Sequence, residues 1–206
     1  IGIRTFFYAS SGSVYGNTRM DTIPETAPFP TQTSLYGASK IAGEGLVGAY
    51  HEAGHLDVAI IGRWMQAIGP HYLHGHVIDF VRQLHTHRDH LDILGDGTQT
   101  KSGIHVTDLA HAICWLTREH ASGLHIYNIG NDRDPVTINE SARIIAATMG
   151  HNPEFRYHGT IWPGDNPNVH LDTIRLRTLG WRPMLPIRDA IRDTVEYLTS
   201  SACTYL

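Results

Sequence analysis

The distribution of apolar and polar residues along this chain of 206 residues predicts strands that alternate with helices. The first two strands are continuous apolar runs, at Thr5–Ala9 and Asp57–Gly62. Between them lies a predicted helix, Leu35–Ala53, with Ser34 in position to cap its first turn. The stretch Arg63–Pro70 follows the second strand as a predicted loop.

Beyond Pro70 the predicted elements are shorter but keep the same alternation. Thr107 and Thr137 are predicted helix caps, and Glu140 completes a capping-box spacing after Thr137. The predicted helices are Val77–His87, Thr107–Thr117, Thr137–Met149, Asp172–Leu179 and Pro186–Leu198, and the predicted strands are Leu91–Leu94, Ile104–Val106, His125–Ile129 and Phe155–Tyr157. This order favours an α/β structure built on parallel strands.

The composition is that of an ordinary globular chain, with 41% hydrophobic residues, 17% charged residues and a formal net charge of -4. Because no basic block stands out, nucleic-acid binding has no electrostatic support, and no apolar run is long enough to span a bilayer. Cys114 lies in an apolar run, where we expect a buried thiol. With Cys203 as the second cysteine, no disulfide framework is implied, which fits a reducing cytoplasm.

Tyr36 and Lys40 lie four residues apart in the first predicted helix, which puts them on one face, one turn apart. A free phenol has a pKa of about 10, too high for a base at neutral pH, and a nearby ammonium group favours the phenolate. Such a pair can move a proton on or off a substrate hydroxyl. The spacing alone also arises by chance, so its interpretation depends on the surrounding residues.

A serine-rich loop supplies that context. Ser10, Ser11 and Ser13 follow the first buried strand directly, so their hydroxyls lie at the carboxyl end of a strand. That end is where α/β sheets bind ligands. A serine hydroxyl at this position can hydrogen-bond the substrate oxygen on which the tyrosine acts.

Six segments of the chain together resemble one protein family. They are YASSGSVYG, SLYGASKIAGE, RWMQAIGP, GDGTQTKSGIHVTDLAHA, YNIG and WPGDNP, in this order. The chain resembles the extended short-chain dehydrogenase/reductase family over almost its whole length, and within it the NAD-dependent nucleotide-sugar epimerases of the UDP-galactose 4-epimerase type. The resemblance implies an α/β fold: the C-terminal part of a Rossmann-type parallel sheet plus a small α/β substrate-binding lobe.

The resemblance also implies an enzyme, an NAD-dependent epimerase that acts on a nucleotide-diphosphate sugar. Tyr36 would be the catalytic acid/base, Lys40 would tune it and hold the nicotinamide ribose, and Ser11 would hydrogen-bond the substrate hydroxyl. Ser10 and Trp64 would lie on the cofactor side with Tyr36 and Lys40. In this family a hydride leaves the sugar carbinol for NAD, the keto-sugar turns over, and the hydride returns to the other face.

Two positions in the serine-rich loop bear on the class of reaction. The sugar 4,6-dehydratases of the family have Asp and Glu where this chain has Gly12 and Ser13. Neither residue can do the acid–base work that elimination of water needs, so elimination is disfavoured. The related uronate decarboxylases keep the Glu, so decarboxylation is disfavoured as well. Epimerisation or simple oxidation at one carbinol remains.

The resemblance places five residues at the substrate. Gln66 stands where the family usually has Asn, Lys101 where an Arg often meets the diphosphate, and Trp162 where epimerases have an Arg before a Gly-Asp pair. Lysine keeps the positive charge but loses the bidentate fork of arginine. Val169 falls where epimerases often have a bulkier residue, which would leave room for an N-acetyl group. Ser13 is the fifth of these candidate substrate contacts.

The family's dinucleotide fingerprint is glycine-rich and follows the first strand. The G-x-G-x-x-G of this chain, Gly43, Gly45 and Gly48, falls inside the first predicted helix with no strand before it, so we interpret these glycines as close-packing residues. We expect the chain to be truncated, without the first half of the Rossmann domain, and to bind NAD weakly by itself. The strands Thr5–Ala9 and Asp57–Gly62 would then lack sheet neighbours.

We expect residues 1–70 to be the remaining portion of an NAD-binding domain, with the sheet returning near 102–130, and residues 71–206 to be mainly the substrate-binding lobe. Two alternatives stay open: a sugar-nucleotide dehydrogenase or reductase of the same family, or an inactive truncated relative that serves as a binding module. Whether the chain forms a homodimer also stays open. The 15 histidines show no metal-binding spacing, so no metal site is expected.

Overall fold

The computed structural model describes residues 3–18, 20–29, 31–159 and 168–200. The strands are β1 (Thr5–Ala9), β2 (Val58–Arg63), β3 (Gln66–Ile68), β4 (His90–Leu94), β5 (Thr100–Lys101), β6 (Gly103–His105), β7 (Gly123–Asn128), β8 (Glu154–His158) and β9 (Asn168–Val169). The helices are the 3-10 turn η1 (Gly12–Tyr15) and α1 (Leu35–Glu52), α2 (His76–Thr86), α3 (Val106–Glu119), α4 (Ile138–Thr148), α5 (Ile174–Thr178) and α6 (Ile187–Thr199). These strands pair in parallel, which confirms the predicted α/β fold.

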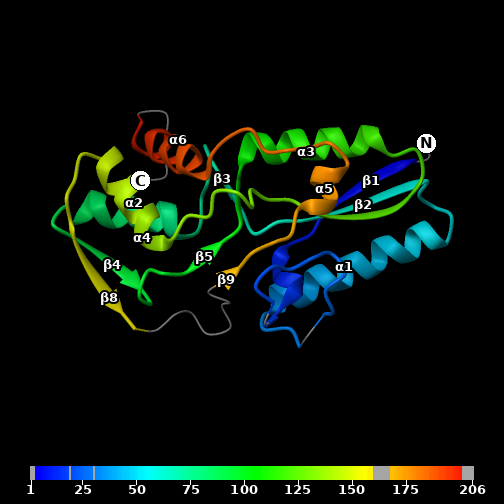
Figure 1. The fold of residues 1–206 in the computed structure, drawn as a ribbon, viewed down its shortest axis with the longest axis horizontal. Helices are drawn as coiled ribbons and strands as arrows, with labels where there is room; N and C mark the ends of the chain where they lie inside the picture. Colours follow the sequence, from blue (N-terminus) through cyan, green and yellow to red (C-terminus); the bar gives the residue numbers. More distant parts are fainter. Residues whose placement is uncertain (1–2, 19, 30, 160–167, 201–206) are drawn as a thin grey trace.

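A three-stranded sheet with β2 at its centre and β1 and β7 on either side carries the first part of the fold. The side chains of β2 alternate between its faces, as a strand requires. Val58 and Ile60 pack with residues of α3, whereas Ala59 and Ile61 pack with Val47 of α1. Figure 1 shows the two helices on opposite sides of the sheet. Because both faces are covered, every residue of β2 is buried.

The helix α1 begins as the sequence predicts. The Ser34 side chain accepts a hydrogen bond from the amide of Gly37 at 3.0 Å, which satisfies one of the unpaired donors of the first turn. The helix ends at Glu52, shortly before Gly54, whose φ of 76° is a left-handed conformation that glycine adopts without strain. The residues Tyr36 and Lys40 therefore lie in the first two turns of a capped helix.

The second part of the fold surrounds a separate hydrophobic core. Helices α2, α4 and α6 contribute Leu84, Ile145 and Ile191 to it, and β4 contributes Leu91. Thr137 caps α4 in a reciprocal capping box with Glu140, as predicted. These elements lie together at the left of Figure 1, beside the parallel pair β4–β8.

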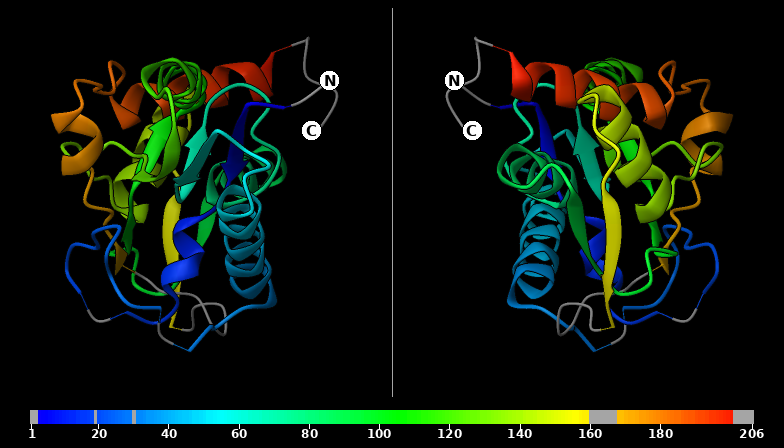
Figure 2. Two further views of the ribbon diagram at one scale, coloured as in Figure 1. Left: turned by 90° about the vertical axis from the view of Figure 1, so that its right-hand side faces the viewer. Right: turned by 90° about the vertical axis from the view of Figure 1, so that its left-hand side faces the viewer.

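Two short parallel pairs run between the two parts. Strand β3 pairs with β6, and β5 pairs with β9, which brings Lys101 level with Val169. The left panel of Figure 2 views the molecule along its length, with α1 and α3 on opposite sides of the strands. Within the described residues, no helix has the length and apolar character needed to cross a bilayer.

Two local predictions were wrong. The predicted loop Arg63–Pro70 contains β3, because Gln66–Ile68 finds a partner strand in β6, which begins much later in the chain, at Gly103. The helix α3 begins at Val106 and not after Thr107. Its cap is His105, whose Nδ1 accepts a hydrogen bond from the Thr107 amide at 3.0 Å. An imidazole acceptor can fill the role that hydroxyl and carboxylate side chains usually take.

Three predictions about burial and pairing were also wrong. Strand β1 is exposed or half-buried along its length, with Phe6 38% exposed, because β2 is its one partner in the described sheet. Cys114 is exposed, because it lies on the outer face of α3 while Ala112 and Leu116 face the sheet. The strand β2 does not lack neighbours, since β7 returns from much later in the chain to pair with it from Val58 to Arg63. In the described sheet, β1 pairs on one side with β2.

Candidate active site

The candidate site lies at the carboxyl end of the three-stranded sheet, where the chain leaves β1 and β2 side by side. The amide of Ser10 donates to the carbonyl of Gly62 at 2.9 Å, and the amide of Gly12 donates to the carbonyl of Trp64 at 2.9 Å. These two bonds extend the β1–β2 ladder past the strand ends. They fix the serine-rich loop against the segment that carries Gln66.

Ser11 and Ser13 form a short hydroxyl relay in this loop. The Ser11 Oγ accepts a hydrogen bond from the amide of Ser13 at 3.1 Å and so caps η1. The two hydroxyl oxygens lie 3.2 Å apart, with Ser11 as the donor. Ser11 is buried, with 4% of its surface exposed, whereas Ser13 is half-buried and lines the neighbouring cavity.

Tyr36 and Lys40 share one face of α1, as their spacing predicts. The Lys40 Nζ lies 5.5 Å from the centre of the Tyr36 ring and donates to the carbonyl of Ala9 at 2.8 Å. This second bond ties the ammonium group to the end of β1. Tyr36 keeps 53% of its surface exposed, so its phenol is accessible. The pair can therefore present an acid/base group with an adjacent positive charge to a bound ligand.

A cavity of about 950 Å³ opens beside these residues and runs from the sheet into the second part of the fold. Its volume lies in the range that small-molecule and cofactor sites usually have. Four of the predicted site residues line it: Ser13, Tyr36, Gln66 and Val169. They come from η1, α1, β3 and β9, so the fold brings together side chains that are far apart in the sequence.

The opposite end of the cavity is lined by residues of α2 and β4. Gln83 locks the two elements together, because its amide nitrogen donates to the Asp92 carbonyl at 3.3 Å and its oxygen accepts from the Asp92 amide at 2.9 Å. The hydrogen bond from His158 lowers the pKa of the Asp92 carboxyl, so it is charged at neutral pH. Phe80 and Leu94 supply apolar surface between these polar groups. This wall suits a ligand with both apolar and polar faces.

Other predicted site residues lie outside this cavity or outside the described residues. The Ser10 hydroxyl donates to Glu44 in the interior, and Trp64 packs as a partly buried member of the core between β2 and α3. Lys101 has its backbone in β5, paired with Val169, and its side chain is not described. Trp162 lies outside the described residues. Their proposed roles stay predictions.

A buried ion pair that the sequence analysis did not single out lies directly beneath the site. The guanidinium of Arg63 holds the Glu44 carboxylate with two bonds, from Nε at 2.9 Å and from Nη2 at 2.6 Å. The residues are 1% and 7% exposed. Burial opposes the charge on Arg63, but the hydrogen bonds and charge of Glu44 outweigh it and raise the arginine pKa. Ser10 donates a third hydrogen bond to the same carboxylate.

The same arginine continues into a polar network toward β7. Its Nη1 donates to the Tyr15 hydroxyl at 2.9 Å, and that hydroxyl donates to the Asn128 Oδ1 at 2.8 Å. The backbone amide of Asn128 in turn donates to the Glu25 carboxylate at 2.8 Å. Burial of this carboxyl raises the pKa of Glu25. An arginine at the end of an otherwise apolar strand, and a glutamate four residues after Lys40, were the signals available in the sequence.

The glycine-rich sequence does not form a dinucleotide-binding loop. Tyr36 and Lys40 lie at the carboxyl end of a parallel sheet, where α/β folds bind ligands. The three glycines of the G-x-G-x-x-G sequence lie inside α1. A β-carbon at Gly43 would meet the ring of Tyr8, which supports the close-packing interpretation there, whereas Gly45 has no neighbour within 4 Å. Within the described residues, these glycines offer no helix N-terminus to a pyrophosphate.

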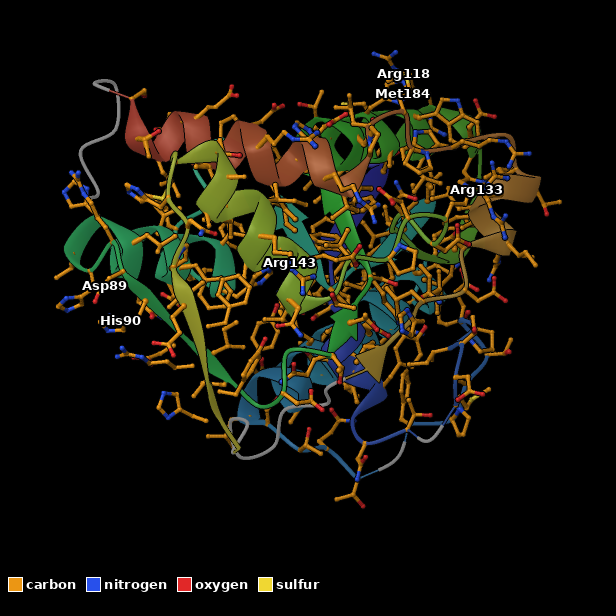
Figure 3. All side chains as sticks on the ribbon, turned by 60° about the vertical axis from the view of Figure 1, so that its left-hand side comes forward. Asp89, His90, Arg118, Arg133, Arg143 and Met184 are labelled. Atoms are coloured by element: carbon orange, nitrogen blue, oxygen red, sulfur yellow. The ribbon has the colours of Figure 1, made fainter. Side chains whose placement is uncertain are left out.

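Three arginines of the described residues lie well apart in Figure 3: Arg118 on α3, Arg133 in the loop before α4, and Arg143 on α4. Asp89 and His90 lie at another end of the molecule, where they contact each other at 3.0 Å. That the chain does not bind nucleic acid stays a prediction.

Comparisons with known proteins identify the relatives of the chain. Residues 1–130 match the NAD dependent epimerase/dehydratase family. The chain is 28% identical over 200 residues to human dTDP-D-glucose 4,6-dehydratase, and 28% identical over 215 residues to GDP-L-fucose synthase 1 of Arabidopsis thaliana. These alignments cover 95% and 98% of the chain, but 56% and 65% of the two relatives.

A solved structure, the UDP-glucose 4-epimerase of Thermus thermophilus in complex with NAD, has the same fold. It superimposes with a TM-score of 0.82 at 26% identity, over 96% of this chain and 65% of that one. The chain therefore spans less than two thirds of the length of these similar proteins. Epimerases, dehydratases and synthases appear among the matches, so the comparisons support a nucleotide-sugar enzyme family and leave the reaction within it open.

Proposed function

Because the chain belongs to the NAD dependent epimerase/dehydratase family, we propose that it acts as a nucleotide-sugar epimerase of the 4-epimerase type. The observation that carries the proposal is that Tyr36 and Ser13 line the same cavity of about 950 Å³, while the Lys40 Nζ lies 5.5 Å from the Tyr36 ring centre. A nucleotide-diphosphate sugar would lie along this cavity with its sugar at the tyrosine. The opposite wall, between α2 and β4, would take the nucleotide.

Each of these side chains has a defined task at the sugar carbinol. The Tyr36 phenol oxygen takes the proton from the carbinol oxygen and returns it, and the Lys40 ammonium lies 5.5 Å from the centre of the Tyr36 ring. Ser11 donates to Ser13 and so orients a hydroxyl pair toward the same oxygen. When bound, NAD supplies the hydride acceptor that makes the carbinol a ketone. Tyr36 and Lys40 would hold its nicotinamide ribose, with Ser10 and Trp64 on the same side.

The loop between Ser11 and Tyr15 favours epimerisation over elimination. Gly12 has no side chain, and the hydroxyl of Ser13 is not an acid or base at neutral pH. A β-carbon at Gly12 would also run into the side chain of Met65, so an acid at this position has no room in the present packing. Removal of water from a sugar needs a second acid–base group, and this loop offers none.

Substrate preference would depend on Val169 and Lys101, which pair across β5 and β9. Val169 is small and lines the cavity, so we propose that an N-acetyl group fits beside it. The rates with UDP-glucose and UDP-N-acetylglucosamine compare the two sugars directly. A strong preference for the smaller sugar would contradict this assignment.

The test of the proposed reaction follows product and cofactor together. The full chain is incubated with NAD and UDP-glucose, the sugar epimers are followed by NMR, and NADH is followed by absorbance. An epimerase forms the second sugar without net NADH, whereas a sugar-nucleotide dehydrogenase accumulates NADH. Substrate binding without either product would support the alternative of an inactive binding module, and a cytoplasmic location stays a prediction.

Tyr36→Phe with Tyr50→Phe as its control assigns the chemistry to one residue. Both tyrosines are exposed on α1, at 53% and 58%, so neither change removes core packing. We expect Tyr36→Phe to lower turnover by about 10²- to 10⁴-fold, the usual contribution of an acid/base group. Tyr50→Phe should leave turnover unchanged. Equal rates in the two variants would contradict the proposed role of Tyr36.

A further inference from the structure

The buried pair Glu44–Arg63 occupies a position from which it can control the candidate site without touching a ligand. Glu44 lies eight residues after Tyr36 in α1, about 12 Å along the helix axis. It is 7% exposed and does not line the cavity beside Tyr36. Its effect on the site can pass through the placement of α1.

Few side chains hold α1 on the sheet. The buried residues of this helix of 18 residues are Gly37, Glu44 and Val47. Gly37 lies against the backbone of Ser13, and Val47 packs on the apolar face of β2. Glu44 makes the polar tether, because its carboxylate accepts from Nε and Nη2 of Arg63 and from Ser10.

The geometry of this tether restricts rotation as well as distance. A carboxylate held by two parallel bonds to a guanidinium has one favourable orientation. Arg63 is itself fixed, since it ends β2 and its guanidinium lies 5.0 Å from the ring centres of both Tyr15 and Phe29. A rotation of α1 about its axis would break both bonds to Glu44 and would move Lys40 away from the Ala9 carbonyl, to which its Nζ donates at 2.8 Å.

The network also joins α1 to the segment that leads into it. Arg63 donates from Nη1 to the Glu25 carbonyl at 3.2 Å, and Phe29 stacks on the same group. Both lie in the segment that precedes the cap Ser34. One guanidinium therefore holds the middle of α1 through Glu44 and the approach to its first turn through Glu25 and Phe29.

We propose that Glu44 and Arg63 are positioning residues that set the rotation of α1 and thereby hold Tyr36 and Lys40 beside the serine-rich loop at the end of β1. This inference rests on the proposed function of Tyr36 and Lys40. Stability alone does not explain the pair, because a buried ion pair is often matched or exceeded in stability by apolar residues of similar volume. The positioning role therefore predicts a displaced α1 in a variant that is as stable as the native chain.

The variant that separates the two roles is Glu44→Met with Arg63→Met, which replaces the ion pair by apolar side chains. The measured quantity is the change that Lys40→Met causes in the NMR signal of the Ala9 carbonyl, in protein with ¹³C-labelled alanine carbonyls. The signal is assigned by its loss in Ala9→Gly. In the native chain the Lys40 Nζ on α1 donates to this carbonyl at the end of β1 at 2.8 Å, so Lys40→Met shifts the signal.

In the double-methionine variant we expect most of this response to be lost while the melting temperature stays near that of the native chain. Arg63→Lys is the second variant, since it keeps the charge but cannot form the two-bond fork. Arg63→Lys should also weaken the NMR response to Lys40→Met. If the double-methionine variant does not fold, Arg63→Lys tests the proposal instead. Arg188→Lys is the matched control, because Arg188 bonds Asp134 and Glu140 in the other part of the fold.

An unchanged response of the Ala9 carbonyl in either folded variant of the pair would overturn the proposal, as would an equal loss in Arg188→Lys. Turnover provides a separate readout, with a lower kcat and little change in KM as the expected result. If the native chain shows no turnover, the proposed function fails, and the spectra still decide whether Glu44 and Arg63 position α1 against the end of β1.

Discussion

The side chain of Met65 fills the space directly above Gly12, so that a β-carbon at position 12 would lie 3.1 Å from Met65 Cγ and closer still to its sulfur. The backbone joins the same two segments, because the Gly12 amide donates to the carbonyl next to Met65, that of Trp64, at 2.9 Å. The serine-rich loop can therefore lie this close to the segment leading into β3 only because position 12 is a glycine.

Gly12→Ala should consequently destabilise the chain by about 1–3 kcal/mol, the usual cost of overpacking. Met65→Ala removes the obstructing side chain, so the same alanine should cost much less in that background. Urea unfolding of the four proteins in this double-mutant cycle gives the coupling energy. Additive effects would show that Met65 is not the obstruction.

The cap of α1 offers a second prediction. Ser34→Ala should lower the free energy of unfolding by about 1 kcal/mol and loosen the turn that carries Tyr36. Thr137→Ala removes the corresponding cap of α4, at a similar cost, far from the serine-rich loop. Hydrogen exchange of the amides from Gly37 to Lys40 should accelerate in the first variant only. Equal acceleration in both would mean that the cap acts on global stability alone.

Two glycines of α1 should respond in opposite ways to alanine. Gly45 has no neighbour within 4 Å, so Gly45→Ala should stabilise the chain by about 0.5–1 kcal/mol through helix propensity. A β-carbon at Gly43 would meet the Tyr8 ring, so Gly43→Ala should leave the chain about 1 kcal/mol less stable than native. Thermal unfolding measures both, and a stabilising Gly43→Ala would contradict the close packing of Tyr8.

The raised pKa of Glu25 makes a prediction about pH. Burial lifts the pKa of this carboxyl above its ordinary value of 4.5, so the folded chain favours the protonated form. The stabilisation from this group is complete below pH 4.5 and is lost as the pH rises through the folded pKa. The glutamine side chain in Glu25→Gln cannot ionise, but its oxygen can still accept a hydrogen bond from the backbone amide of Asn128.

Glu25→Gln should therefore gain stability relative to the native chain as the pH increases toward neutrality. The measurement is the difference in melting temperature between the two proteins at several pH values. A difference that does not change with pH would show that Glu25 has no shifted titration in the fold.

The glycine pattern predicts weak binding of NAD by this chain alone. The sequence has its one G-x-G-x-x-G inside α1, where no helix N-terminus faces a pyrophosphate. Calorimetry with NAD should give a Kd above about 1 mM, which corresponds to about 4 kcal/mol of binding free energy or less. Tight binding would mean that other residues hold the pyrophosphate.

Local sequence signals predicted most of the fold. The cap at Ser34, the capping box of Thr137 and Glu140, and the apolar run that became β2 each depend on residues within a few positions of one another. Tyr36 and Lys40 share a helix face for the same reason. Short-range periodicity and capping therefore gave their positions correctly.

Features that depend on distant partners were missed. The run Gln66–Ile68 is too short to identify as a strand until β6 pairs with it, and Glu44 gives no sign in the sequence that Arg63 will meet it. Cys114 is exposed because Ala112 and Leu116 of the same helix face the sheet and it does not. Such relationships are fixed by tertiary packing, which no window along one chain contains.

The bond between Tyr15 and Asn128 joins residues that are 113 positions apart. A contact of this sequence separation forms only after a large loop has closed, and such contacts slow folding. During synthesis, α1 and β2 leave the ribosome long before β7. Tyr36 and Lys40 are therefore made before the strand that completes the three-stranded sheet. In a nascent chain, the charges of Glu44 and Arg63 must therefore stay paired with each other, or hydrated, until Asn128 has been synthesised.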